Sequence, residues 1–346
     1  MNKENYYNPV VDILRIISIF AVVFIHTTTR TLEASLFDLS HYPFSIFLNQ
    51  IFRFAVPLFF MISGFVLELN FHLHESYLAY LKKRISRILI PYIFWSTIYF
   101  FVIYTRHSEN FFQALLGGDA SYQLYFIPAL LLFYIIFPII HKYYSFFSNK
   151  FVFIFLGTVQ ILLLYINYYL HPLSTFYPVS IALLNYFIFF LGVVCSKHIK
   201  EIMQVFKKWR YIFYTITLIL ALYVFLEGES LYFKTHNYLY FYSQWRPSVF
   251  IYTVFLSAFL YYVFSKNFLP IALIKTLSRL SFFVFFIHII ILELVWSLFG
   301  KNIFLQSQNV FGKLWFDPFY FITVIIISFL IAFIAHKIPK LNKLTG

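Results

Sequence analysis

The sequence predicts an all-α integral membrane protein, a bundle of about ten transmembrane helices with both termini in the cytoplasm. Three observations lead to this fold class. The 346-residue chain is 62% hydrophobic and only 11% charged, a composition that soluble domains of this size do not have. Apolar runs long enough to cross about 30 Å of hydrocarbon recur along the chain. Basic residues concentrate in every second connecting segment, which orients the helices.

Ten apolar segments have the length of a membrane-spanning helix, which is about 20 residues. They are residues 10–29, 44–68, 88–105, 122–141, 151–170, 179–196, 211–227, 246–265, 280–299 and 316–336. With the N-terminus inside, 18 of the 26 Lys and Arg residues fall on the cytoplasmic side and six on the outer side. The remaining two, Arg15 and Arg53, lie within predicted spans. This bias predicts a multi-pass protein of the cytoplasmic membrane.

The net charge of +13 is mainly a consequence of this topology. Basic cytoplasmic segments attract anionic membrane lipids, so we expect lipid contacts and no nucleic-acid partner. The short connecting segments predict one transmembrane domain over residues 1–346, with no separate soluble domain and no cleavable signal peptide. The single cysteine, Cys195, excludes an internal disulfide. No His or Cys cluster has metal-ligand spacing, so we expect no metal.

The first span carries three ionisable residues, Asp12, Arg15 and His26. An Asp or Arg at the centre of a membrane helix costs about 2.5–3.5 kcal/mol on insertion scales, so such residues are usually functional. Eleven residues separate Arg15 from His26, which places them within about 20° of one face and about 16 Å apart along the axis. Asp12 lies three residues before Arg15 and is expected to pair with it. A row of polar residues on one face of a helix is equally consistent with a structural contact that pairs two membrane helices.

The second and third spans place further arginines near the membrane. Arg53 lies inside the second span, with Pro57 and Ser63 after it. It either ties two helices together or lines a polar cavity, and Ser63 is a candidate partner for backbone groups that Pro57 frees. Arg84 and Arg87 share one helical face at the cytoplasmic end of the third span. They satisfy the positive-inside pattern, and two guanidinium groups so spaced also match phosphate geometry.

Polar residues near the outer side are candidates for contact with a substrate. Tyr125, at the start of the fourth span, belongs either to an interfacial aromatic belt or to a surface that stacks on a sugar. Arg246, at the outer end of the eighth span, is a candidate contact for an anionic or sugar acceptor. His288, near mid-membrane in the ninth span, is either a packing residue or a catalytic one. Glu293 needs a partner, for which the candidates are Arg53, His26 and His288.

Together these motifs resemble the membrane acyltransferase-3 family, bacterial O-acyltransferases that modify cell-surface glycans. The similarity covers nearly the whole chain. Its parts are Asp12-x-x-Arg15 followed by His26, Arg53 with Pro57 to Phe60 and Ser63 to Phe65, Arg84-x-x-Arg87 with Pro91, Tyr125-Phe126-Ile127 with Pro138, and Ser281 with Ile287-His288.

The resemblance implies an enzyme that moves an acyl group, commonly acetyl, from cytosolic acyl-coenzyme A to a hydroxyl of an extracytoplasmic or lipid-linked carbohydrate. It implies His26 as the catalytic histidine and Arg15 as its partner in the motif, and it places Arg84 and Arg87 at the acyl-CoA donor. Asp12 is then expected to hold Arg15 in place. A separate glycan-assembly protein is a further partner that it suggests.

Two other functions fit the same sequence. One is export of a polysaccharide or lipid-linked glycan precursor, since some members of the family are named as export proteins. The other is a non-catalytic role in assembly or regulation. An exporter needs a conduit wide enough for the glycan and no acyl donor, whereas the enzyme needs only a narrow route for a thioester. In the enzyme, His26 acts either as a general base or as a transient acyl carrier.

Overall fold

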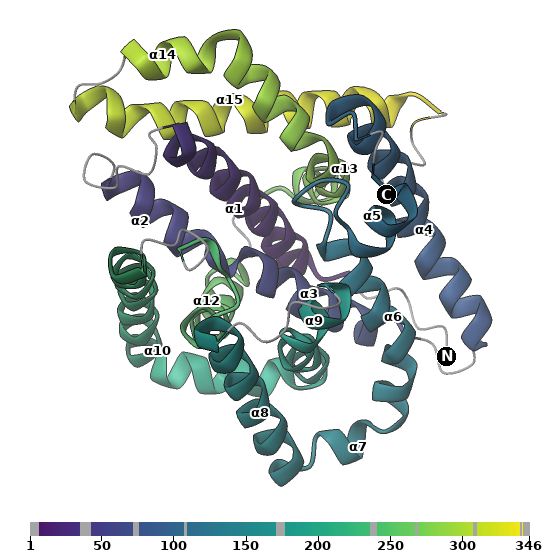
Figure 1. The fold of residues 1–346 in the computed structure, drawn as a ribbon. Coiled ribbons are helices and arrows are strands. Elements are labelled where there is room, and N and C mark those ends of the chain that lie inside the picture. Colours follow the sequence, from purple (N-terminus) through teal and green to yellow (C-terminus); the bar gives the residue numbers. More distant parts are fainter. Residues whose placement is uncertain are drawn as a thin grey trace.

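The computed structural model describes residues 7–34, 43–71, 76–106, 109–170, 177–235, 241–266, 269–306, 310–339 and 341. Regular structure within these ranges is entirely helical (Figure 1). The elements are α1 (Pro9–Ala34), α2 (Pro43–Ile51), η2 (Phe52–Phe54), α3 (Ala55–Leu69), α4 (Tyr77–Thr97), η3 (Ile98–Ile103), α5 (Phe111–Gly117), α6 (Phe126–Lys142), α7 (Tyr144–Phe147), α8 (Lys150–Leu170), α9 (Tyr177–Leu183), α10 (Tyr186–Thr235), α12 (Pro247–Phe264), α13 (Ile271–Val295), η4 (Trp296–Gly300), α14 (Lys301–Gln306) and α15 (Val310–Lys337).

The predicted multi-pass helical membrane protein is confirmed, with a span count that differs in detail. Eight helices of the described part are long and apolar enough to cross a membrane. The fourth predicted span is α6, whose 17 residues make it shorter than these eight. The sixth and seventh predicted spans are joined in α10, which bends at His198 and Trp209, where the backbone leaves helical geometry. The count of about ten is therefore approximate.

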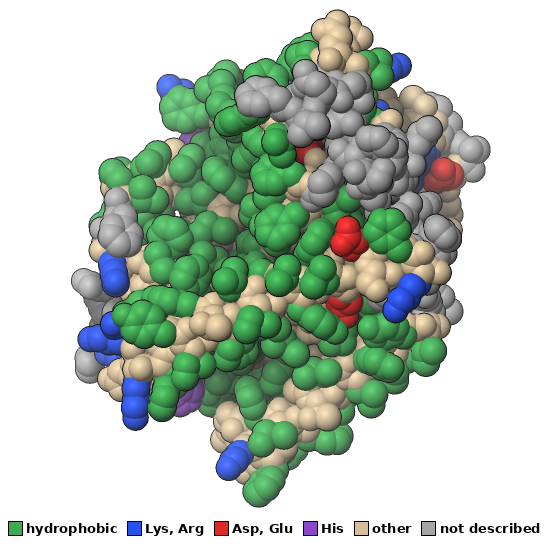
Figure 2. Space-filling view, turned by 90° about the vertical axis from the view of Figure 1, so that its left-hand side faces the viewer, with side chains coloured by type: hydrophobic (Ala, Val, Ile, Leu, Met, Phe, Trp, Pro, Cys, Tyr) green, Lys and Arg blue, Asp and Glu red, His purple; other side chains and the backbone are tan. Residues whose placement is uncertain are grey.

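The first helix, α1, runs through the middle of the bundle. It contacts α2, α3, α12, α13 and α15 (Figure 1), and most of its residues are buried. The outer helices turn apolar side chains outward instead. Figure 2 shows one face on which hydrophobic side chains cover most of the described surface, while Lys and Arg lie mainly near its margins. The polar residues of α1 therefore face protein rather than lipid.

Polar contacts between helices agree with the alternating topology. On the predicted cytoplasmic side, Glu68 of α3 lies 2.9 Å from His141 of α6 and 3.1 Å from Lys197 of α10. On the predicted outer side, Arg30 of α1 pairs with Glu293 of α13 at 3.3 Å. Each contact joins helix ends that the basic-residue pattern places on one side of the membrane.

The second predicted span is interrupted near its middle. Helix α2 gives way to the 3₁₀ turn η2, and α3 begins at Ala55. Pro57 has no backbone N–H, so the carbonyl of Arg53 receives no helical hydrogen bond from it. A tighter turn at this position is a common response. The interruption places Arg53 in the bundle interior, where only 4% of it is exposed.

Helices α3 and α10 meet backbone to backbone at two glycines. A Cβ atom at Gly64 would lie 2.1 Å from the carbonyl oxygen of Phe189, and one at Gly192 would lie 2.0 Å from that of Met61. Small residues allow such close approach of membrane helices. This contact fixes the position of α3, which carries several residues of the site.

We expect Gly64→Ala to destabilise the fold by about 1–3 kcal/mol, because the added methyl group meets backbone that cannot move aside. The thermal unfolding midpoint of the detergent-solubilised protein should fall accordingly. Gly157→Ala is the matched control, since its Cβ meets only the ring of Phe187, at 3.1 Å. An equal fall for both variants would contradict the close α3–α10 contact.

Candidate active site

The imidazole of His26 lies at the wall of a cavity of about 550 Å³. Its ring centroid is 5.0 Å from that of Tyr122 and 5.3 Å from that of His288. His26 stands near the outer end of α1 in the predicted topology. We call this space, lined by His26, Arg53, Gln123, Tyr125 and Trp245 among others, the outer cavity. Its volume is that of a typical small-ligand site.

His288 is fully buried beside His26. Its Nδ1 lies 3.1 Å from the carbonyl oxygen of Val284 in the preceding helical turn. A carbonyl only accepts, so this contact assigns the proton to Nδ1 and leaves Nε2 as an acceptor. No hydrogen-bond partner of that Nε2 is found among the described residues. The two imidazoles therefore form a pair in which one ring orientation is fixed by the backbone.

Arg53 supplies a buried cation at the same cavity. Its guanidinium donates to the carbonyl oxygen of Tyr242 at 2.7 Å and to Oδ1 of Asn49. The amide nitrogen of Asn49 in turn donates to Oγ1 of Thr28 at 2.8 Å and to the carbonyl of Ile25 at 3.2 Å. Both acceptors lie next to His26 in α1, so this relay holds Arg53 in register with the histidine. Arg53 therefore does both things that the sequence allowed: it lines the outer cavity, and it links neighbouring segments of the bundle.

Aromatic rings form one wall of the outer cavity. The ring of Tyr125 packs edge-on against Tyr177 at 5.8 Å and against Trp245 at 5.7 Å. The Tyr125 hydroxyl accepts a hydrogen bond from Gln244 at 2.6 Å. Such amphipathic surfaces suit a sugar ring, which has apolar faces and polar edges. The stacking interpretation of Tyr125 fits this arrangement.

Gln123 lines the outer cavity with a donor that is still available. Its Oε1 accepts a hydrogen bond from Ser121 at 2.6 Å, and 2% of the residue is exposed. Its Nε2 has no hydrogen-bond partner among the described residues. A buried amide donor without a partner costs about 1–3 kcal/mol, which makes it a candidate contact for an oxygen of a bound substrate.

A second space, the inner cavity, lies toward the cytoplasmic side and has a volume of about 280 Å³. Three arginines are among its lining residues, Arg15, Arg87 and Arg279, and the guanidinium of Arg279 lies 3.1 Å from Nε2 of His336. Ser63 lines it as well, and its hydroxyl donates to the carbonyl of Phe59 at 2.8 Å. Arginine forks bind phosphate oxygens in pairs. The lining is mainly apolar, and its three arginines make the space a candidate anion site.

The expected pairing of Asp12 with Arg15 is confirmed, at 2.8 Å. Ser278 of α13 completes the cluster, because its hydroxyl accepts from Arg15 at 2.9 Å and donates to Asp12 at 2.7 Å. Arg15 also lines a third space of about 240 Å³, the mouth cavity, with Tyr7, Asp12 and Asn70. The mouth cavity and the inner cavity share Arg15 and Val66, so they adjoin.

The two arginines of the third span differ in position. Arg87 lines the inner cavity, whereas Arg84 is half-buried beside it. The phenol of Tyr134, which also lines the inner cavity, lies within electrostatic reach of both Arg84 and Arg15. Arg84 is therefore close to Tyr134 but is not among the residues that line the inner cavity.

The expected partners of Glu293 require correction. Its carboxylate pairs with Arg30 at 3.3 Å, and not with Arg53, His26 or His288. Glu293 lies more than one helical turn beyond His288 on α13. At that height in the bundle its neighbour is Arg30, near the end of α1. The Arg30 guanidinium also lies 4.7 Å from the centroid of the Trp296 ring. This pair is peripheral to the outer cavity.

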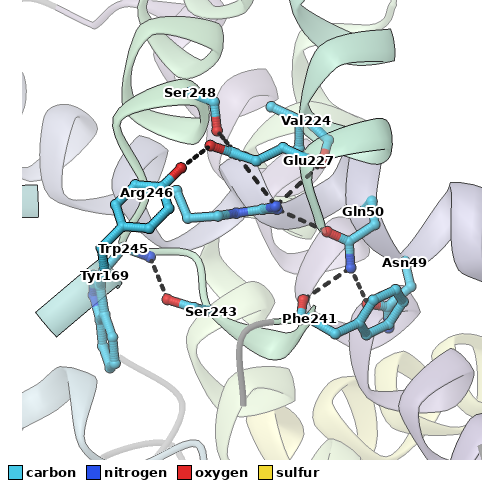
Figure 3. Close-up of polar contacts among 10 residues, drawn as sticks. All are labelled: Asn49, Gln50, Tyr169, Val224, Glu227, Phe241, Ser243, Trp245, Arg246 and Ser248. Carbon is cyan, nitrogen blue, oxygen red and sulfur yellow. Dashed lines mark hydrogen bonds and ion pairs between the residues drawn. The ribbon is translucent and has the colours of Figure 1, made fainter. Parts of the chain in front are cut away.

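The expected contact of Arg246 with an acceptor also requires correction, because the side chain is fully buried. Its guanidinium donates to Gln50 at 2.7 Å and to the carbonyl of Val224 at 3.2 Å, and it lies 3.5 Å from Glu227 (Figure 3). Ser248 donates to the same carboxylate. Arg246 therefore locks α2, α10 and α12 together behind the outer cavity, while its neighbours Gln244 and Trp245 line that cavity.

The family model described as an acyltransferase domain matches residues 8–335. The chain belongs to this acyltransferase-3 family. The match includes every residue of the two main cavities, so the acyltransferase domain and the described bundle are the same unit. No group of three or more His, Cys, Asp or Glu residues that could hold a metal ion is found in the described part of the acyltransferase.

Curated relatives of this acyltransferase come from staphylococci. A protein of Staphylococcus aureus strain MRSA252 is 27% identical over 314 residues, which cover 86% of this chain and 85% of the relative. A Staphylococcus epidermidis protein is 26% identical over 311 residues, covering 84% and 82%. Both are named as probable poly-β-1,6-N-acetyl-D-glucosamine export proteins. No solved structure matches significantly.

Three residues of the candidate site had no functional role in the sequence interpretation. They are Arg279 of the inner cavity and Gln123 and Trp245 of the outer cavity. Arg279 directly follows Ser278, the serine that bridges Asp12 and Arg15. It therefore lies at the same level of the bundle as that ion pair. Gln123 and Trp245 lie outside regular helices, where no periodicity indicates which way a side chain faces.

Proposed function

We propose that this membrane acyltransferase moves an acyl group, acetyl in the first instance, from cytosolic acyl-coenzyme A to a hydroxyl of a carbohydrate at the outer side. The observation that carries this proposal is the placement of two unlike cavities along one route. Three arginines line the inner cavity, and His26 and an aromatic wall line the outer cavity. The first suits a phosphorylated donor, and the second suits proton transfer at a sugar hydroxyl.

The donor's phosphates fit the cytoplasmic part of the route. Arg15, Arg87 and Arg279 line the inner cavity and are the proposed contacts of the phosphates, with Arg84 as a nearby cation. A diphosphate and a ribose phosphate offer the anionic oxygens that such groups bind in pairs. The ion pair with Asp12 and the contact with Ser278 hold the Arg15 guanidinium in place. The thioester end then extends toward His26.

His26 carries the chemistry. As a general base it takes the proton of the acceptor hydroxyl while a new C–O bond forms to the acyl carbon and the C–S bond breaks. The departing coenzyme A thiolate takes up a proton. In the alternative route, a His26 nitrogen forms a bond to the acyl carbon as the C–S bond breaks and coenzyme A leaves as a thiolate that takes up a proton. The sugar oxygen then bonds to the acyl carbon, the N–acyl bond breaks, and the released imidazole takes the hydroxyl proton. In both routes, Arg53 and Gln123, which line the outer cavity, are the proposed groups that stabilise negative charge on the acyl oxygen in a low-dielectric site.

The acceptor is proposed from the aromatic wall and from the relatives. Tyr125, Tyr177 and Trp245 offer faces for a sugar ring, and the staphylococcal relatives are named for a poly-β-1,6-N-acetyl-D-glucosamine polymer. A hydroxyl of a lipid-linked or growing glycan is therefore the proposed nucleophile. A separate glycan-assembly protein would present it at the outer face.

The direct test uses membranes that contain the protein, radiolabelled acetyl-coenzyme A and an N-acetylglucosamine oligomer as acceptor. We expect label in the oligomer, with release of free coenzyme A in equal amount. Control membranes without the protein should give neither product. No labelled oligomer or membrane glycan above that background would reject the acyltransferase proposal.

Removal of one cation from the inner cavity should weaken donor binding. A hydrogen bond to a charged group contributes about 1.5–3 kcal/mol, so we expect Arg87→Ala to raise the KM for acyl-coenzyme A by about 10- to 100-fold. Arg84→Ala should have a smaller effect. Lys82→Ala, an exposed cation of the same segment, is the control and should leave KM unchanged. Equal KM values for all three variants would contradict the placement of the phosphates.

The second candidate is an exporter, and it rests on the printed names of the relatives. It predicts movement of the glycan across the membrane without any acyl donor. The outer cavity is of ligand-pocket size and meets the inner cavity at a layer of phenylalanine rings, an arrangement that favours transfer of a small group. Glycan translocation into vesicles that lack acyl-coenzyme A would instead support the exporter.

A further inference from the structure

The outer and inner cavities have three lining residues in common, Phe59, Phe126 and Phe285. They come from α3, α6 and α13, so three helices contribute one ring each. The centroid of Phe126 is 5.8 Å from that of Phe59 and 5.9 Å from that of Phe285. These distances are those of rings in direct contact. We call these three residues the phenylalanine constriction.

Two of the rings are firmly held. Phe126 and Phe285 are each 8% exposed. Phe126 also packs on Phe60 at 4.7 Å, and Phe285 packs on Phe286 at 5.4 Å. Phe59 is half-buried and is the ring with the most freedom to move. Because protein interiors are densely packed, we expect any widening between these rings to come mainly from displacement of Phe59.

The constriction adjoins the histidine pair. The Phe285 ring lies 6.4 Å from that of His288, which is 5.3 Å from His26. An acyl thioester whose phosphates rest on Arg15 and Arg87 must therefore bring its carbonyl carbon past the three rings to reach His26. This holds for direct transfer and for an acyl-histidine alike.

We propose that Phe59, Phe126 and Phe285 form a filter that sets which acyl groups this enzyme accepts, according to their width and charge. The proposal rests on the acyltransferase function above. A narrow, neutral acyl group passes edge-on between the rings, whereas a branched one must displace a packed ring. A carboxylate on the acyl group loses hydration among apolar side chains and finds no partner there.

The test compares donors on the full-length protein in membranes. Acetyl-, isobutyryl- and succinyl-coenzyme A are supplied separately, and kcat/KM is measured for transfer to the same oligomer. For the wild type we expect acetyl to exceed both others at least tenfold. Phe59→Ala should raise the isobutyryl-to-acetyl ratio at least tenfold and leave the succinyl-to-acetyl ratio low, because the enlarged passage is still apolar.

Two further variants distinguish an effect on the filter from a general loss of folding. Phe59→Leu removes less volume and should shift the ratio in the same direction. Phe60→Leu is the matched control, since Phe60 also packs on Phe126 but lines neither cavity, and its ratio should stay at the wild-type value. An unchanged isobutyryl-to-acetyl ratio in Phe59 variants that still transfer acetyl would overturn the filter alone. Absence of transfer from every donor by the wild type would overturn the proposed function and the filter together.

Discussion

His26→Ala is expected to lower acyl transfer by at least about 100-fold, because a positioned general acid or base contributes roughly 10²–10⁴-fold. His26 lines the outer cavity beside Tyr122 and His288, and no other described imidazole lines that cavity. The measurement is the rate of label transfer from acetyl-coenzyme A to a glycan oligomer in membranes with matched amounts of protein. Donor binding at the inner cavity should be retained, so KM changes little while kcat falls.

The control for this variant is His198→Ala. His198 is exposed at the bend of α10, where its Nε2 lies 3.2 Å from the Tyr144 hydroxyl, and its removal should leave transfer unchanged. A second readout separates the two chemical routes. If His26 carries the acyl group, label should accumulate on the wild-type protein when acceptor is withheld, and His26→Ala should abolish that signal. Undiminished transfer by His26→Ala would refute the assigned role.

Arg246→Ala is expected to destabilise the protein by about 3–5 kcal/mol, because removing one member of a buried ion pair leaves an uncompensated charge. Arg246 is fully buried, and Glu227, Gln50 and the carbonyl of Val224 all face its guanidinium. The loss should appear as a lower midpoint in thermal unfolding of the detergent-solubilised protein. Transfer activity should fall in proportion to the folded fraction, since Arg246 does not line the outer cavity.

A paired replacement sharpens this test. Arg246→Met combined with Glu227→Gln removes both charges, so it should be more stable than Arg246→Ala alone. Arg210→Ala is the control, because Arg210 is half-buried on α10, where its guanidinium donates to the Tyr211 hydroxyl at 3.1 Å and also neighbours the Tyr262 hydroxyl, so its removal leaves no buried carboxylate without a partner. If Arg246→Ala unfolded like the wild type but raised the KM for the acceptor, the earlier view of Arg246 as an acceptor contact would be restored.

The sequence predicted the helices well because membrane spans depend on local composition. A run of apolar residues must form a helix in lipid, since each backbone group needs an internal partner. Where the structure differs from the predicted spans, the difference arises from a local feature of the sequence together with the packing of neighbouring helices. Pro57 divides the second span into α2, η2 and α3, and two bends rather than a break connect the halves of α10.

The site was predictable only where its contacts lie within one helix. The Asp12–Arg15 pair follows from a three-residue spacing, and the structure confirms it. The partner of Glu293 and the surroundings of Arg246 depend on which helices adjoin, which spacing along the chain does not reveal. Burial was also decisive, because a sequence alone does not distinguish an arginine at a cavity wall, such as Arg87, from one behind it.

The phenylalanine constriction also has an electrical consequence. A membrane voltage changes the energy of a unit charge by about 2.3 kcal/mol per 100 mV, and most of the voltage falls across the layer of lowest dielectric constant. Ionisable residues line the cavities on both sides of Phe59, Phe126 and Phe285, His26 and Arg53 in the outer cavity and Arg15 and Arg87 in the inner one, so that layer is thinner than the bilayer. Apolar constrictions of this kind exclude water. Along the proposed acyl route, we therefore expect the three rings to act as a barrier that keeps protons and ions from leaking across the membrane.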